Sequence, residues 1–229
     1  APRQLRRATR RRRPRLHFPV TTGDYDAPGW LRNPHAQTIY GSLFARAPDI
    51  AYRRERWDTP DGDFVDIDHI DGPAESPLLV LFHGLEGSSR SPYARMLMQH
   101  VAKAGWRGAV FNFRGCSGEP NRLPRAYHSG DAAEIGWALQ RFSERATRAP
   151  LLAAGVSLGG NALLKWLGEQ GASAQAILAR AAAISAPVDL MAAGEALEQG
   201  FCKVYARHFL STMKSRAAAK HRRFPGSFD

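Results

Sequence analysis

The sequence has 229 residues, which is long enough for one domain with a sizeable core and short for two. Its 44% hydrophobic and 23% charged residues are typical of globular proteins, and no apolar stretch approaches the roughly 18 residues that a membrane span needs. The two cysteines, Cys116 and Cys202, lie far apart, which excludes a disulfide framework or a CxxC site and favours a reducing, cytoplasmic location.

The formal net charge of +11 is concentrated at the start of the chain. Residues 1–15 contain eight arginines and no acidic residue, and without these arginines the net charge is +3. Such a segment repels itself and buries no face, so we predict a disordered Arg-rich tail over 1–15 and one domain over 16–229. The tail favours weak contact with an anionic membrane surface. No base-reading motif accompanies it, so we expect no specific nucleic-acid partner.

The first part of the predicted domain contains an irregular segment and a hairpin. Residues 16–50 are rich in proline, glycine and polar residues, which indicates a lead-in with one short helix. Two extended runs between Tyr52 and Ile70 flank a Pro60-Asp61-Gly62 sequence. Because Pro60 presets φ and Gly62 tolerates a positive φ, these runs predict an antiparallel hairpin.

After the hairpin, strands and helices alternate. Short apolar runs predict strands buried on both faces, and apolar residues at helical spacing predict helices between them. The strands are expected over 78–82, 109–113, 151–156 and 181–185, and the helices between Ser91 and Gly105 and over 131–145 and 161–167. This order predicts an α/β protein with a mostly parallel, doubly wound sheet and right-handed crossovers.

One strand-to-helix junction carries a motif for nucleophilic catalysis. Residues 155–159 read Gly-Val-Ser-Leu-Gly, which is the G-x-S-x-G pattern of a nucleophile elbow. The glycines leave room for a sharp turn that exposes the Oγ atom of Ser157 and directs the following helix N-terminus at a developing oxyanion. The alternative is a serine that only caps the helix. A buried strand before the motif and a helix after it favour catalysis.

The loop after the first parallel strand, His83-Gly84-Leu85-Glu86-Gly87, supports this interpretation. In such sites one oxyanion-hole N–H comes from this loop and the other from the residue after the nucleophile, so we expect the backbone N–H groups of Leu85 and Leu158 to form the oxyanion hole. We interpret His83 as a structural residue that braces the loop. Cys116 follows a strand, and we expect it to be a buried, inert thiol.

Several sequence blocks together resemble the YheT-like (EMB8-like) family of α/β-hydrolases, from about Trp30 to Phe224. The matching blocks are Asn33-Pro34-His35-Ala36-Gln37-Thr38, His83-Gly84-Leu85-Glu86-Gly87-Ser88-Ser89, Asn112-Phe113-Arg114-Gly115-Cys116-Ser117-Gly118, Gly155-Val156-Ser157-Leu158-Gly159-Gly160-Asn161 and Ser185-Ala186-Pro187-Val188-Asp189-Leu190. The resemblance implies an α/β-hydrolase fold and a carboxylic-ester hydrolase, with Ser157 as nucleophile. Relatives act on acyl esters such as monoacylglycerols, medium-chain esters or phospholipids. No cofactor or metal is expected.

The resemblance also implies a difference from the family. In this fold the nucleophilic serine works with an acid and a histidine as a catalytic triad, and both partners follow the serine in the sequence. The sequence ends at Asp229, inside what resembles the helical cap, so we expect the last strands, part of the cap and the two triad partners to have no counterpart here. Asp189 with His208 fits the chain order formally, but nothing else recommends the pair, and His221 lies in a basic stretch. We therefore expect this chain to be inactive by itself.

Three hypotheses follow. The first is a serine esterase acting on a small acyl ester. The second is a non-catalytic protein of the same fold that binds a small molecule or partner in the same pocket. The third is a surface or nucleic-acid binder that acts through its Arg-rich tail.

Overall fold

The computed structural model describes residues 26–44, 46–146 and 149–226, so the predicted tail over 1–15 lies outside the described residues. The chain divides into two compact units, 1–44 and 45–229. The described part of the first unit contains a short 3₁₀ turn, a six-residue helix α1 and a π-helical turn, with bounds Gly29–Leu31, Pro34–Ile39 and Tyr40–Phe44. The side chain of Asn33 caps α1 by accepting the N–H groups of His35 and Ala36.

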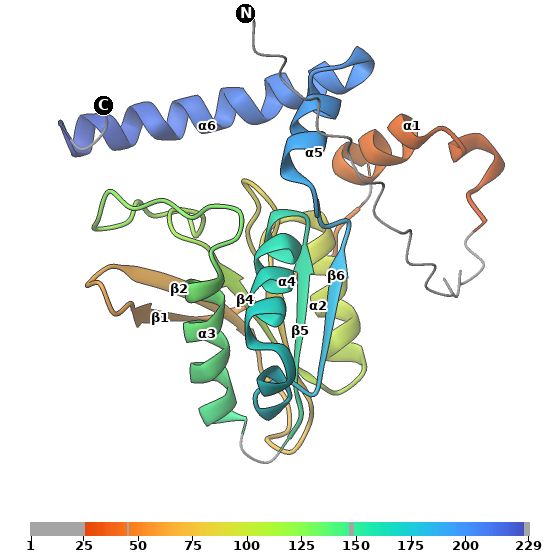
Figure 1. Ribbon diagram of the computed structural model, residues 1–229. Coiled ribbons are helices and arrows are strands. Elements are labelled where there is room, and N and C mark those ends of the chain that lie inside the picture. Colours follow the sequence, from red (N-terminus) through yellow and green to blue (C-terminus); the bar gives the residue numbers. More distant parts are fainter. Residues whose placement is uncertain (1–25, 45, 147–148, 227–229) are drawn as a thin grey trace, which may run out of the picture. The chain divides into compact units, whose positions relative to one another are not determined.

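The second unit is built on one six-stranded sheet with the order β1-β2-β4-β3-β5-β6 (Figure 1). β1 pairs with β2 and β2 with β4 in antiparallel fashion, and the remaining neighbours are parallel. The bounds are β1 Arg53–Asp58, β2 Phe64–Ile70, β3 Leu78–Phe82, β4 Arg107–Asn112, β5 Leu151–Val156 and β6 Arg180–Ile184. The predicted mostly parallel sheet with an antiparallel hairpin at its start is confirmed, including the positive φ of 85° at Gly62.

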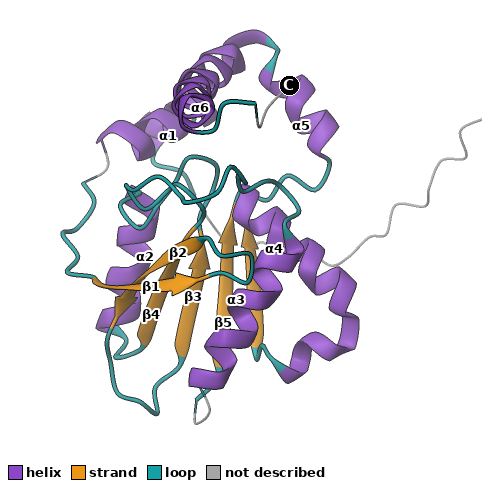
Figure 2. Ribbon diagram, turned by 90° about the vertical axis from the view of Figure 1, so that its left-hand side faces the viewer, coloured by secondary structure: helices purple, strands orange, loops and turns teal. Residues whose placement is uncertain are grey.

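Helices cover both faces of this sheet (Figure 2). α2 lies on one face, and α3 and α4 lie on the other. The helices of this unit are α2 Pro92–Lys103, α3 Ala132–Arg145, α4 Leu158–Gln170, α5 Leu190–Leu197 and α6 Lys203–Arg223, with 3₁₀ turns at Gly171–Ala176 and Gly200–Cys202. Among the described residues, no helix is both long enough and apolar enough to cross a membrane.

The core divides into two clusters because neighbouring residues of a strand point to opposite faces. In β3, Val80 and Phe82 pack in the cluster that contains the buried residues of α3 and α4. Leu81 packs instead with Met98 and Val101 of α2. Both faces of the central strands are thus buried, as their continuous apolar sequence predicts.

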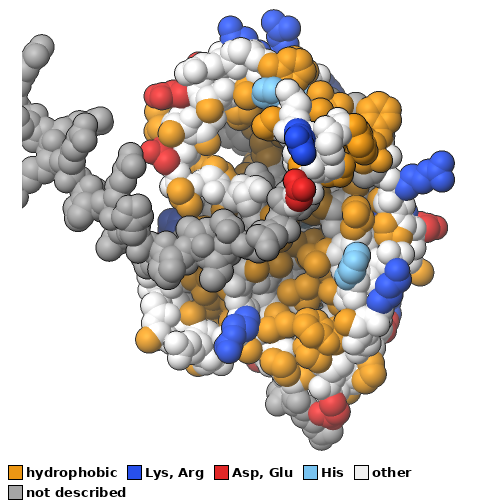
Figure 3. Space-filling view, turned by 90° about the vertical axis from the view of Figure 1, so that its right-hand side faces the viewer, with side chains coloured by type: hydrophobic (Ala, Val, Ile, Leu, Met, Phe, Trp, Pro, Cys, Tyr) orange, Lys and Arg blue, Asp and Glu red, His pale blue; other side chains and the backbone are white. Residues whose placement is uncertain are grey.

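The outer elements of the second unit are less well covered. Every residue of β6 is exposed, with Ile184 at 46%, and β6 forms one edge of the sheet. Exposed hydrophobic side chains continue into α5, where Met191 is 75% exposed. Figure 3 views the molecule from this side and shows hydrophobic side chains gathered on the surface.

Candidate active site

Ser157 lies at the turn between β5 and α4, with φ 51° and ψ −116°. This left-handed conformation is strained for a residue with a side chain. Backbone hydrogen bonds hold it on both sides: the N–H of Ser157 donates to Ile184 O (2.9 Å), and its carbonyl accepts the N–H of Asn161 (2.9 Å). The side chain makes no capping hydrogen bond to α4. The alternative interpretation of Ser157 as a capping serine is therefore wrong.

The glycines around Ser157 are required by contacts with backbone atoms. A Cβ atom on Gly155 would lie 2.6 Å from Gly159 O and from the Cα of Gly160. A Cβ atom on Gly159 would lie 2.5 Å from His83 O and would also collide with the carbonyl of Phe82. These distances are below any that real Cβ atoms adopt, so the helix packs against the strand and the loop only with glycine at both positions.

The loop after β3 lies directly beside Ser157. β3 and β5 are paired, with Phe82 opposite Gly155. A Cβ atom on Gly84 would lie 3.2 Å from the Cβ atom of Ser157. Residues 84–87 form a tight turn, closed by the hydrogen bond from Gly87 N–H to Gly84 O (3.0 Å). The structure therefore brings the turn that carries Leu85 next to the serine that precedes Leu158.

His83 is completely buried and braces this loop. Its Nε2 atom accepts the backbone N–H of Phe113 (3.1 Å), and its Nδ1 atom lies 2.8 Å from Gly84 O, so Nδ1 carries the proton and donates it. Burial lowers the pKa of His83 to about 4. A neutral imidazole with both nitrogens engaged fits the structural role that we predicted for it.

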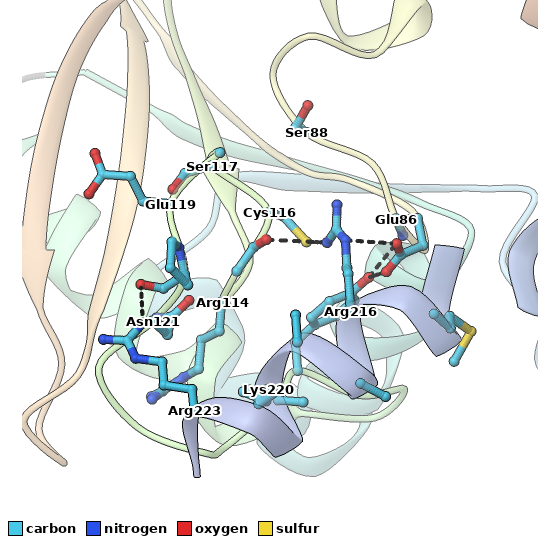
Figure 4. Close-up of a pocket in the computed structure, with 18 of the residues that line it drawn as sticks. Glu86, Ser88, Arg114, Cys116, Ser117, Glu119, Asn121, Arg216, Lys220 and Arg223 are labelled. Atoms are coloured by element: carbon cyan, nitrogen blue, oxygen red, sulfur yellow. Dashed lines mark hydrogen bonds and ion pairs between the residues drawn. The ribbon is translucent and has the colours of Figure 1, made fainter. Parts of the chain in front are cut away.

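A cavity of about 1080 Å³ lies beside the turn (Figure 4). It is enclosed by the loop after β3, the loop after β4 and one side of α6, and its surface is mostly apolar. Leu85 lines this cavity, whereas Ser157 and Leu158 are not among its lining residues. Of the predicted site residues, Leu85 is therefore the one that borders this cavity.

Cys116 lines the same cavity and is 5% exposed. Burial raises the pKa of the Cys116 thiol, and Arg216 Nη1 lies 3.3 Å from its Sγ atom. A raised pKa keeps the thiol protonated and poorly nucleophilic, which agrees with the predicted inert thiol.

In the part of the chain that the structure describes, no histidine forms a hydrogen bond with Ser157. Within 26–44, 46–146 and 149–226, no hydrogen bond connects a side chain to Ser157 Oγ. His208 and His221 both lie in α6. The carboxylate of Asp189 caps α5 by accepting the N–H of Ala192 (3.0 Å), and no contact with His208 is present among the described residues. The same part of the chain contains no group of three or more His, Cys, Asp or Glu side chains that could hold a metal ion.

Three residues of this region were missed by the sequence analysis: Glu86, Tyr127 and Arg216. Glu86 has a φ of 57°, and its side chain contacts both of the others. Glycine is the residue that signals a left-handed conformation in a sequence. Because a glutamate occupies this position, the sequence contains no such signal here. Tyr127 and Arg216 are 41 and 130 residues away, and nothing in the sequence signals those contacts.

Comparisons with known proteins identify the fold family of the chain. The family model described as "alpha/beta hydrolase fold" matches residues 77–227. The chain is 43% identical over 198 residues to "Putative esterase YheT" of Escherichia coli (strain K12), which covers 85% of this chain and 58% of that protein. It is 30% identical over 214 residues to "Phospholipase ABHD3" of Homo sapiens, which covers 90% of this chain and 52% of that protein. The chain thus spans somewhat more than half of the length of these two relatives.

A solved structure shows the same fold. The α/β hydrolase GrgF from Penicillium sp. sh18 aligns with a TM-score of 0.50 and 15% sequence identity, over 60% of this chain and 46% of that one. At this identity the likeness concerns the arrangement of strands and helices alone.

Proposed function

This chain belongs to the α/β-hydrolase fold family, and from that premise we propose that it forms the nucleophile part of a serine ester hydrolase acting on acyl esters. The observation that carries the proposal is the conformation of Ser157. A strained serine between a buried strand and a helix N-terminus, with a hydroxyl that caps nothing, is the arrangement that nucleophilic attack requires.

The proposed reaction starts with attack of Ser157 Oγ on the ester carbonyl carbon while a base accepts the hydroxyl proton. The carbonyl oxygen becomes an oxyanion, which the backbone N–H groups of Leu85 and Leu158 would stabilise. Leu158 is the first residue of α4, so its N–H has no acceptor within the helix. Collapse of the tetrahedral intermediate breaks the ester C–O bond, and the base returns its proton to the leaving oxygen, which departs as the alcohol. Water then attacks the acyl-serine while the base takes its proton, and return of that proton to Ser157 Oγ releases the free acid.

The substrate class is inferred from the cavity and from the relatives. The cavity beside Leu85 is large and mostly apolar, which suits a hydrocarbon chain. Two relatives carry the names of an esterase and a phospholipase. An acyl ester of the monoacylglycerol or phospholipid type therefore fits best, and a role in lipid metabolism follows from that choice. The cytoplasmic location and the membrane contact of the Arg-rich tail stay predictions.

A non-catalytic binding protein is the second candidate. It is favoured by one observation: no base contacts Ser157 Oγ within the described residues. Removing a triad member costs a serine protease up to about 10⁶ in turnover. On this basis we expect only trace activity from the 229-residue polypeptide.

Turnover of p-nitrophenyl esters by this chain separates the two candidates. We expect slow hydrolysis that decreases in Ser157→Ala. Because no base contacts Ser157 Oγ within the described residues, added imidazole should accelerate the parent chain above the rate of Ser157→Ala with the same imidazole. Equal rates for the two proteins, with and without imidazole, would favour the binding protein. Fast Ser157-dependent turnover without imidazole would show that the chain contains its own base, and His208 and His221 would be mutated first.

A further inference from the structure

Glu86 adopts a backbone conformation that its residue type disfavours. Its φ of 57° places it in the left-handed region, at the third position of the turn Gly84–Gly87. Turns with a positive φ at that position normally carry glycine or asparagine there. A glycine would remove the strain, so the glutamate side chain must supply interactions that hold the turn in this form.

Tyr127 holds Glu86 from one side. Its hydroxyl accepts the backbone N–H of Glu86 (2.8 Å) and donates to Glu86 Oε1 (3.1 Å). The Tyr127 ring stacks on Phe113, with centroids 5.3 Å apart and planes inclined by 10°. Burial raises the pKa of Tyr127, so its hydroxyl remains a donor. This anchor belongs to the core of the second unit.

Arg216 of α6 holds Glu86 from the other side. Its Nε atom lies 3.0 Å from Glu86 Oε2, and its Nη1 atom donates to Gly115 O (3.2 Å) and approaches Cys116 Sγ (3.3 Å). Figure 4 shows the guanidinium between Cys116 and Glu86. One side chain of α6 therefore connects the loop after β3 with the loop after β4.

The contacts of Glu86 matter for the proposed oxyanion hole because Leu85 is its neighbour in the turn. Leu85 lies between Gly84, which packs against Ser157, and Glu86, which Tyr127 and Arg216 hold. The N–H of Leu85 belongs to the Gly84–Leu85 peptide, whose carbonyl oxygen accepts hydrogen bonds from Gly87 N–H (3.0 Å) and His83 Nδ1 (2.8 Å). The next peptide carries the Glu86 N–H, which Tyr127 holds. An oxyanion hole works only when its donors are placed in advance, so a fixed Glu86 favours catalysis by keeping the turn, and with it the adjoining Leu85 peptide, in one conformation.

We propose that Glu86 and Arg216 are positioning residues: their ion pair fixes the turn Gly84–Gly87 and so couples α6 to the oxyanion hole beside Ser157. This inference rests on the proposed function. Both side chains line the cavity, and their proposed role is to hold the backbone of the turn rather than to contact the reacting atoms.

Amide hydrogen exchange on the full 229-residue chain tests the coupling without any need for activity. In Arg216→Ala, we expect the Glu86 amide to exchange about tenfold faster, while the amides of β5 keep their rates. Arg216→Lys should restore part of the protection, because the charge remains and the fork that reaches Gly115 is lost. Lys214→Ala removes an exposed cation from the same helix and should leave exchange at Glu86 unchanged.

Glu86→Gly separates positioning from folding. Glycine relieves the strain, so its unfolding midpoint in urea should equal or exceed that of the parent chain. Its imidazole-supported, Ser157-dependent turnover should nevertheless fall, through the maximal rate rather than the KM. A variant that only disturbs folding would lose stability and activity together.

Two results would overturn the coupling: unchanged exchange at Glu86 in Arg216→Ala, or additive effects of Glu86→Gln and Arg216→Ala on that exchange. Failure of the proposed function would look different. Turnover would then not depend on Ser157, while the exchange rates would still show whether Arg216 fixes the turn.

Discussion

At the scale of single residues, Ser157 and its glycines were readable from the sequence, and Glu86 was not. The G-x-S-x-G pattern predicted a sharp turn, and the structure gives Ser157 a positive φ there. The pattern succeeds because each glycine is required by a backbone collision that any side chain would cause. Glu86 carries no such signal, because tertiary contacts with Tyr127 and Arg216 impose its conformation.

The steric requirement at the elbow predicts the effect of two substitutions in one helix. In Gly159→Ala, the new Cβ atom would meet the backbone of Phe82 and His83, so we expect a loss of about 3 kcal/mol in the free energy of unfolding. Gly168 lies in the same helix with nothing within 4 Å of its would-be Cβ atom. Gly168→Ala should gain about 0.5–1 kcal/mol. Urea denaturation measures both, and equal effects would contradict the packing of α4 against the loop.

At the scale of elements, the alternation of strands and helices was predictable, but the start of α4 and the strand order were not. The predicted helix over 161–167 begins in the structure at Leu158, directly after the nucleophile. Glycines at 159 and 160 lower helix propensity, and packing overrides it. The order β1-β2-β4-β3-β5-β6 depends on crossovers whose partners the local sequence does not specify.

A buried ionic cluster joins several of these elements, and it was not visible in the sequence. Arg114, which follows β4, donates to Glu134 of α3 (2.6 Å) and to Asp61 (2.9 Å) and Asp63 (3.2 Å) of the β1–β2 turn. The side chains of Arg114, Asp63 and Glu134 are at most 2% exposed. Burial raises the pKa of Glu134, despite the neighbouring guanidinium. The cluster fixes the hairpin against the parallel sheet.

Removing the cation of this cluster should cost much more than removing a surface cation. Arg114→Met leaves Asp63 and Glu134 buried without a counter-ion, and we expect a loss of about 3–5 kcal/mol in the free energy of unfolding. Arg53 pairs with Asp71, and both side chains are more than half exposed. Arg53→Met should therefore change stability by less than about 1 kcal/mol. Losses of similar size in urea denaturation would show that the cluster does not stabilise the fold.

At the scale of the whole molecule, the family and the general fold followed from the sequence, whereas the role of α6 required coordinates. The sequence blocks around Ser157 and His83 follow directly after β5 and β3, which are neighbours in the sheet. α6 lines the cavity, and hydrogen bonds from its side chains hold it there. Lys220 Nζ donates to Arg125 O (2.6 Å) and Arg216 to Gly115 O, and each donor is about 100 residues from its acceptor in the sequence. Local sequence patterns contain no information about such contacts.

A fluorophosphonate probe shows whether Ser157 is a nucleophile beside an oxyanion hole. The serine oxygen displaces fluoride and forms a stable phosphonyl ester that mass spectrometry can locate. With imidazole present as an external base, we expect slow modification of Ser157 and none at that position in Ser157→Ala. Modification of another serine, or an unmodified Ser157 in the folded chain, would contradict the assignment of Ser157 as nucleophile.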